Sequence, residues 1–184
     1  MKSHCYAKAA LLSAKTHFKV IQGEGLNEIS EEVMEILNTL KELQIRKSVS
    51  LEPIHLEAAL EYAAIRSSLA PKEQEDERYY FLLNRMQEDF TSFENHHTRE
   101  YLHAIEKNPE KRALFACYMT FIDAEKFRIE ARQLDKEERL GEMEEQNENA
   151  LALYSEIKEN PLAPDLLLDR IAKSILKVNA LTSY

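Results

Sequence analysis

The segment 108–129, NPEKRALFACYMTFIDAEKFRI, carries the clearest helix signal in the chain. Asparagine caps a helix with its side-chain oxygen, and proline suits the first helical position because its missing N–H has no partner there anyway. Apolar residues then recur every three or four positions, which is the spacing of one helix face. They are Leu114, Phe115, Tyr118, Met119, Phe121, Ile122, Phe127 and Ile129. The segment therefore predicts a helix that begins at Pro109.

The same periodicity extends outward on both sides of this segment and predicts further helices. Upstream, helices are predicted at 4–21, at 27–45 or 30–45 (beginning at Asn27 or at Ser30) and at 53–68. A further helix begins at Pro71 and either continues through Ile105 or breaks at Thr91-Ser92. Downstream, a last helix is predicted at about 164–180, after Asn160-Pro161 and Pro164. Apolar residues of 150–157 follow the same spacing.

Segment 135–149 has the weakest pattern, because its apolar residues are reduced to Leu140 and Met143. Seven acidic residues stand there against two basic ones. Asp135 and Glu138 have the spacing of a capping box, and Gly141 weakens a helix interior. We interpret the segment as helix with a kink or break; a loose hairpin tip is the alternative.

Few residues in the chain favour turns: among 184 residues there are three glycines and five prolines. Folds rich in strands need frequent turns, which these residues usually build. We therefore predict an all-α fold, an irregular antiparallel bundle of six or seven helices that forms a single domain over residues 1–184.

The net charge and the two cysteines argue against nucleic-acid binding and against a metal or disulfide framework. The formal net charge is −9, so phosphate backbones repel the surface and nucleic-acid binding is not expected. Cys5 and Cys117 form no metal or disulfide framework, which indicates two reduced thiols. No apolar run reaches bilayer length, and no secretory signal is evident. We expect a cytoplasmic protein in a reducing compartment.

The spacing Glu-x-x-His, which places a carboxylate and an imidazole on one helix face, occurs three times. Helical bundles that hold two iron or two manganese ions use this spacing. The pairs are Glu52/His55, Glu94/His97 and Glu100/His103. The competing interpretation is a solvated surface, because segment 94–100 is polar throughout. Our main expectation is that the protein has no cofactor, with iron or manganese as the alternative.

The first 22 residues contain four lysines and no acidic residue. On a helix over residues 4–21, Lys8, Lys15 and Lys19 fall in one stripe together with His4. This stripe has three interpretations: contact with an acidic part of the same fold, contact with an anionic membrane surface or an acidic partner, and a mitochondrial presequence.

Two further groups stand out. Tyr79, Tyr80 and Phe81 are consecutive and cannot all face one way, so we expect one of them at a helix–helix contact or a dimer interface. Asp123 and Glu125 interrupt an apolar run. A carboxylate facing the core would have a raised pKa and could serve as a general base. We expect instead that both acids lie on the solvated side, with Glu125 pairing with Arg128 and Arg132 on the helix surface.

No nucleotide-binding loop, catalytic serine motif or zinc-protease motif occurs in the sequence. Our main hypothesis is a non-enzymatic helical protein that acts through protein–protein interaction, as an adaptor, chaperone-like, secretion-associated or effector protein. The first alternative is a metal-dependent helical-bundle enzyme that uses the three Glu-x-x-His pairs. The second is a peripheral membrane protein that binds through the basic helix 4–21. A homodimer is compatible with each.

Overall fold

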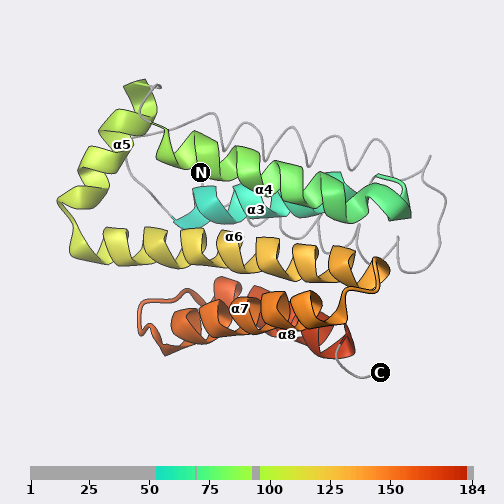
Figure 1. Cartoon of the computed structure of the whole chain (residues 1–184). Helices are drawn as coiled ribbons and strands as arrows, with labels where there is room; N and C mark the ends of the chain where they lie inside the picture. Colours follow the sequence, from blue (N-terminus) through green and yellow to red (C-terminus); the bar gives the residue numbers. More distant parts are fainter. Residues whose placement is uncertain (1–52, 69, 93–95, 182–184) are drawn as a thin grey trace. The chain divides into compact units, whose positions relative to one another are not determined.

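The computed structural model describes residues 53–68, 70–92 and 96–181, which are coloured in Figure 1. Regular structure in these ranges is helical and includes no strand, so the predicted all-α class is confirmed. The helices expected at 4–21 and 30–45 lie outside the described residues. The chain falls into two compact units, 1–79 and 80–184. The single domain expected over 1–184 stays a prediction.

The described part of the first unit is α3 (Pro53–Ser68), a short 3-10 turn (Lys72–Gln74) and the first residues of α4 (Glu75–Thr91). α3 has the predicted bounds, and it buries Leu56, Leu60 and Ala63, which share one face. The long helix begins at Glu75 and not directly at Pro71, because the 3-10 turn intervenes. Three acidic residues occupy the first turn of α4, where the helix dipole favours negative charge.

The second unit contains the rest of α4, then α5 (His96–Glu106), α6 (Pro109–Lys136), α7 (Leu140–Glu159) and α8 (Asp165–Leu181). Of the two alternatives for the helix after Pro71, the structure has the break at Thr91-Ser92, since α4 ends at Thr91. The predicted start of α6 is also confirmed. The Asn108 side chain accepts a hydrogen bond from the backbone N–H of Lys111 (3.1 Å), and Pro109 takes the first helical position.

The connection between α6 and α7 consists of residues 137–139. The backbone N–H of Arg139 donates to the Leu134 carbonyl (3.0 Å), and that of Glu138 donates to the Asp135 carbonyl (3.1 Å). These two bonds form a Schellman motif, whose central residue adopts a left-handed conformation, and Glu138 has a φ of 59°. The helix-with-a-break interpretation of 135–149 is therefore right. The capping box is wrong, because Asp135 lies in the last turn of α6.

Helices α6, α7 and α8 contact one another, and each reverses the direction of the one before it (Figure 1). Residues buried on α7 are spaced alternately by four and three, as in the apolar seam of a coiled coil. They are Met143, Asn147, Ala150, Tyr154 and Ile157. α8 repeats this spacing with Leu167, Ile171, Ser174 and Val178. The core of the second unit therefore lies where these three helices meet.

Candidate functional site

α6 carries two groups of polar side chains on roughly opposite faces. With 100° of rotation per residue, Asp123, Lys126 and Glu130 fall within about 60° of one another. Glu125 and Arg128 point roughly the other way. The first group contacts α4, and the second faces α7 and α8. The two groups differ in burial and chemistry.

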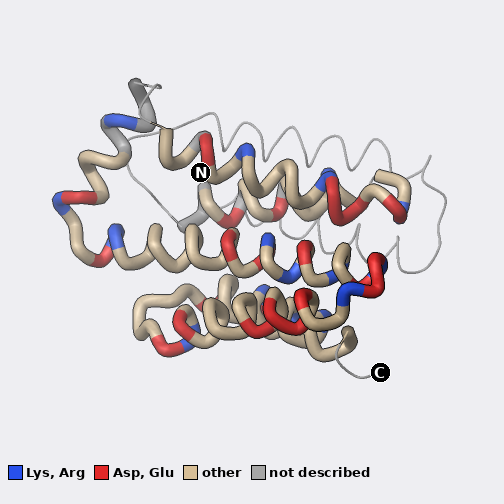
Figure 2. The backbone as a smooth tube through the Cα atoms, in the orientation of Figure 1, with Lys and Arg blue, Asp and Glu red and all other residues tan. Residues whose placement is uncertain are grey.

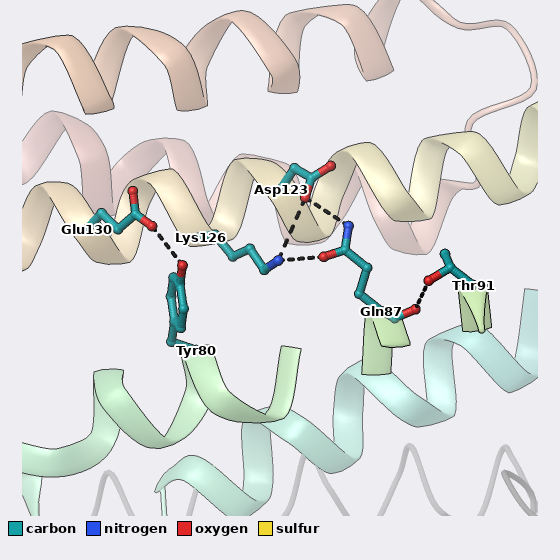
Figure 3. Close-up of polar contacts among 6 residues, drawn as sticks. All are labelled: Tyr80, Gln87, Thr91, Asp123, Lys126 and Glu130. Carbon is teal, nitrogen blue, oxygen red and sulfur yellow. Dashed lines mark hydrogen bonds and ion pairs between the residues drawn. The ribbon is translucent and has the colours of Figure 1, made fainter. Parts of the chain in front are cut away.

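The α4–α6 seam is formed by Tyr80 and Gln87 from α4 with Asp123, Lys126 and Glu130 from α6 (Figure 3). The Tyr80 hydroxyl donates to Glu130 Oε1 at 2.8 Å. Gln87 Nε2 donates to Asp123 Oδ1 at 3.0 Å, while Gln87 Oε1 accepts from Lys126 Nζ. Both ends of the Gln87 amide are thus held by α6, and because the paired residue numbers rise on one helix and fall on the other, the helices run antiparallel.

Lys126 is the centre of the α4–α6 seam. Its ammonium lies 4.0 Å from Asp123 Oδ1 and 6.0 Å from the centroid of the Tyr80 ring, within reach of a cation–π interaction. The Lys126 side chain is only 17% exposed, whereas that of Asp123 is 46% exposed. The cation is therefore compensated by groups from both helices and largely shielded from water.

Tyr80, in the Tyr79–Phe81 triplet, contacts another helix, as the sequence led us to expect for one of the three. The hydrogen bond to Glu130 raises the pKa of the Tyr80 phenol, and burial and the negative charge of Glu130 act in the same direction, against a hydrogen bond with Asn84. Tyr80 therefore remains a neutral hydrogen-bond donor at physiological pH. Phe81 is exposed.

On the opposite face of α6, a buried cluster joins α6, α7 and α8. Glu125 and Arg128 are 2% and 3% exposed. Arg128 donates through Nε to Glu125 Oε1 (3.2 Å) and through Nη2 to Glu125 Oε2 (2.9 Å), a bidentate arrangement. The Tyr154 hydroxyl of α7 donates to Glu125 Oε1 at 2.6 Å, and Ser174 of α8 adds a further hydrogen bond. The Glu125 carboxylate thus accepts hydrogen bonds from side chains of all three helices.

The buried cluster corrects our expectation for Glu125. The pair with Arg128 exists, but it lies in the core and not on the surface. Burial opposes ionisation of Glu125; even so, its pKa is lowered because Arg128, Ser174 and Tyr154 together favour the carboxylate. Burial and the neighbouring carboxylate raise the pKa of Tyr154. A lowered pKa does not suit a general base, so the geometry favours a structural role for Glu125.

Cys117 lies in the core, as its apolar neighbours suggest. It is a free cysteine, and burial is the main factor that raises the pKa of its thiol. A buried, protonated thiol is a poor nucleophile.

Most residues of the predicted metal site are not placed by the structure. Glu52 and Glu94 lie outside the described residues, and of His55, His97 and Glu100 only the helical backbone is described. His103 is exposed, and its Nδ1 lies 3.9 Å from Glu106 Oε2. Among the described parts of the chain, no group of three His, Cys, Asp or Glu side chains could hold a metal ion. The iron or manganese site stays a prediction.

Lys8, Lys15 and Lys19, the predicted partner or membrane contacts, lie outside the described residues. Within the described ranges, no helix is both long and apolar enough to span a membrane.

Sequence reasoning missed the residues that connect different helices. Asp123 and Lys126, like Glu125 and Arg128, have a spacing of three that marks neighbours on one helix. Nothing in the sequence pairs Tyr80 with Glu130, fifty residues away, or Tyr154 with Glu125. A tyrosine within the apolar pattern of 150–157 was the available signal, because a buried tyrosine hydroxyl needs a partner.

Comparisons of the chain with protein-family models, with curated proteins and with solved structures gave no match.

Proposed function

We propose that the chain is a non-enzymatic helical protein that acts by binding a protein partner, as an adaptor, chaperone-like, secretion-associated or effector protein. The observation that carries this proposal is a hydrogen-bonded connection between α7 and α8 with exposed apolar side chains, which we call the α7–α8 corner (residues 160–166).

The backbone of the α7–α8 corner is fixed by its own hydrogen bonds. Asn160 ends α7; its side-chain oxygen accepts from the N–H of Leu162 (2.9 Å), and its carbonyl accepts from the N–H of Ala163 (3.0 Å). The Pro164 carbonyl then accepts from Leu167 (2.9 Å) at the start of α8. A loop held in this way loses little conformational entropy when a partner binds.

Apolar side chains project from this corner into solvent. Leu162 is 44% exposed and Leu166 is 50% exposed, and Pro161 beside them is also exposed. Single exposed leucines are common, but apolar residues gathered on a rigid connection between two helices are typical of a contact surface. Burying them against a partner would contribute the apolar centre of an interface.

The charges around the corner indicate the chemistry of the partner. Glu159 precedes the corner and Asp165 lies within it; both are exposed, as is Lys158, and the net charge of the chain is −9. Figure 2 shows further acidic residues along α7. Electrostatic complementarity therefore favours a protein surface with an apolar centre and a basic rim.

A capture experiment tests this proposal. The full chain is immobilised and incubated with an extract of its native cells, and proteins bound by wild type are compared with those bound by Leu162→Gln/Leu166→Gln. The matched control is Leu140→Gln/Leu176→Gln, which changes two exposed leucines elsewhere in the unit. We expect the corner variant to lose a protein that the control retains. If both variants retain every protein captured by wild type, the corner is not the binding surface.

We also propose a cytoplasmic, reducing location, which the free and buried Cys117 supports. Alkylation of the denatured protein, isolated from native cells without reductant, should label both Cys5 and Cys117. A disulfide at either cysteine would contradict this location.

A further inference from the structure

The α4–α6 seam differs in chemistry from the contact of α6 with α7 and α8. The interhelical contacts described for the seam are hydrogen bonds and a cation–π contact, made by long side chains that are partly exposed. Water can replace such contacts, so each contributes little net stability. Among the described residues of the seam, Lys126 is the cation that several of these contacts share.

The opposite face of α6 resists separation. Moving α7 or α8 away would strip Tyr154 or Ser174 from the buried Glu125–Arg128 pair and disrupt the packed ring contact between Phe121 and Tyr154, whose centroids lie 6.2 Å apart. A buried ion pair that loses its hydrogen-bond partners is strongly destabilised. The contact between α4 and α6 should therefore open at a lower free energy than the contact of α6 with α7 and α8.

We infer that the α4–α6 seam is a releasable contact, through which segment 80–91 of α4 separates from α6 while α6, α7 and α8 stay assembled. Separation uncovers Lys126, which the closed protein largely shields, and increases the exposure of Asp123 and Glu130 beside it on α6.

Hydrogen exchange of the full-length protein tests this inference. Segment 80–91 also buries Leu83 and Met86, and a helix of this length is marginal once packing is lost, so its amides exchange faster when its contact with α6 opens. We expect the amides of 80–91 to exchange about tenfold faster, or more, than those of 150–157 in α7, after correction for intrinsic rates. Equal protection of the two segments would overturn the inference.

The first variant is Lys126→Met, which keeps the aliphatic stem but removes the shared cation. We expect exchange of 80–91 to accelerate about threefold or more, with 150–157 unchanged. Lys173→Met, at an exposed position of α8, is the matched control and should change neither segment. Equal acceleration of both segments in Lys126→Met would show that the unit opens as a whole, and would overturn the inference.

The second variant strengthens the contact and remains informative if Lys126→Met fails to fold. Gln87→Glu/Asp123→Asn moves one carboxylate from α6 to α4 without a change in net charge. Lys126 then pairs with an acid across the seam, and the amide introduced at position 123 can donate to the carboxylate introduced at position 87. Exchange of 80–91 should slow about two- to fivefold while 150–157 keeps its rate. No slowing of 80–91 would contradict a contact centred on Lys126.

Discussion

At the scale of single residues, the buried Glu125–Arg128 pair connects α6 to α7 and α8. Both charges are removed from water, and their desolvation is offset by a bidentate contact and by Tyr154 and Ser174. An isolated buried charge has no such compensation. Removing one partner of the pair should therefore cost more free energy than the intact pair contributes to stability.

Arg128→Met should lower the free energy of unfolding by about 3–5 kcal/mol, because Glu125 would remain buried without its cation. The double variant Glu125→Leu/Arg128→Met should lose clearly less, since it leaves no uncompensated charge. Urea denaturation measures both. A loss below about 1 kcal/mol for Arg128→Met would show that the pair is solvated.

Glu125 also makes stability depend on pH. Its folded-state pKa is lowered below the ordinary value of 4.5, so the unfolded state binds the proton more tightly. The stability that Glu125 provides is present above about pH 4.5 and is lost as the pH falls through the folded-state pKa. We expect Glu125→Gln to destabilise the protein more at about pH 7 than at about pH 3. A difference from wild type that is the same at both pH values would contradict the lowered pKa.

At the scale of elements, helix ends were predictable where the signal is local. Asn108 and Pro109 specify the start of α6 by themselves, so the sequence was sufficient. A break within 135–149 was expected, but the exact end of α6 was not predictable, because the left-handed residue of its Schellman motif is a glutamate and not the expected glycine. The burial of Glu125 was also missed, because it depends on partners supplied by α7 and α8.

The left-handed conformation of Glu138 predicts that glycine has opposite effects on the free energy of unfolding at the adjacent positions 137 and 138. Glu138→Gly should raise the free energy of unfolding by about 0.5–1 kcal/mol, because glycine adopts a φ of 59° without strain. Glu137, with a φ of −88°, gains no such relief, so Glu137→Gly should be destabilising. Thermal unfolding of the two variants measures the difference. A stabilising effect of Glu137→Gly would contradict the described turn.

The N-cap of α6 gives a second prediction at this scale. Asn108→Ala removes the acceptor for the Lys111 N–H and should lower the free energy of unfolding by about 1 kcal/mol. Asn108→Asp retains the acceptor and should restore most of this loss. Chemical denaturation measures both variants. Equal losses for alanine and aspartate would show that the side chain is not the cap.

At the scale of the whole molecule, the all-α class followed from composition and periodicity, because every segment with a strong apolar repeat predicts the same kind of element. The arrangement of helices did not follow, since periodicity identifies a buried face without identifying what covers it. The α4–α6 seam illustrates this limit: its two halves lie more than thirty residues apart in sequence and carry no mark of their pairing.

The central claim is that α6 is a continuous helix whose one face packs on α7 and α8 through the buried cluster. Nuclear magnetic resonance tests it most directly. We predict helical Cα shifts over 109–136, 140–159 and 165–181, a break at 137–139, and nuclear Overhauser effects between the rings of Phe121 and Tyr154. Extended-strand shifts in these ranges, or the absence of contacts between the two rings, would contradict the account.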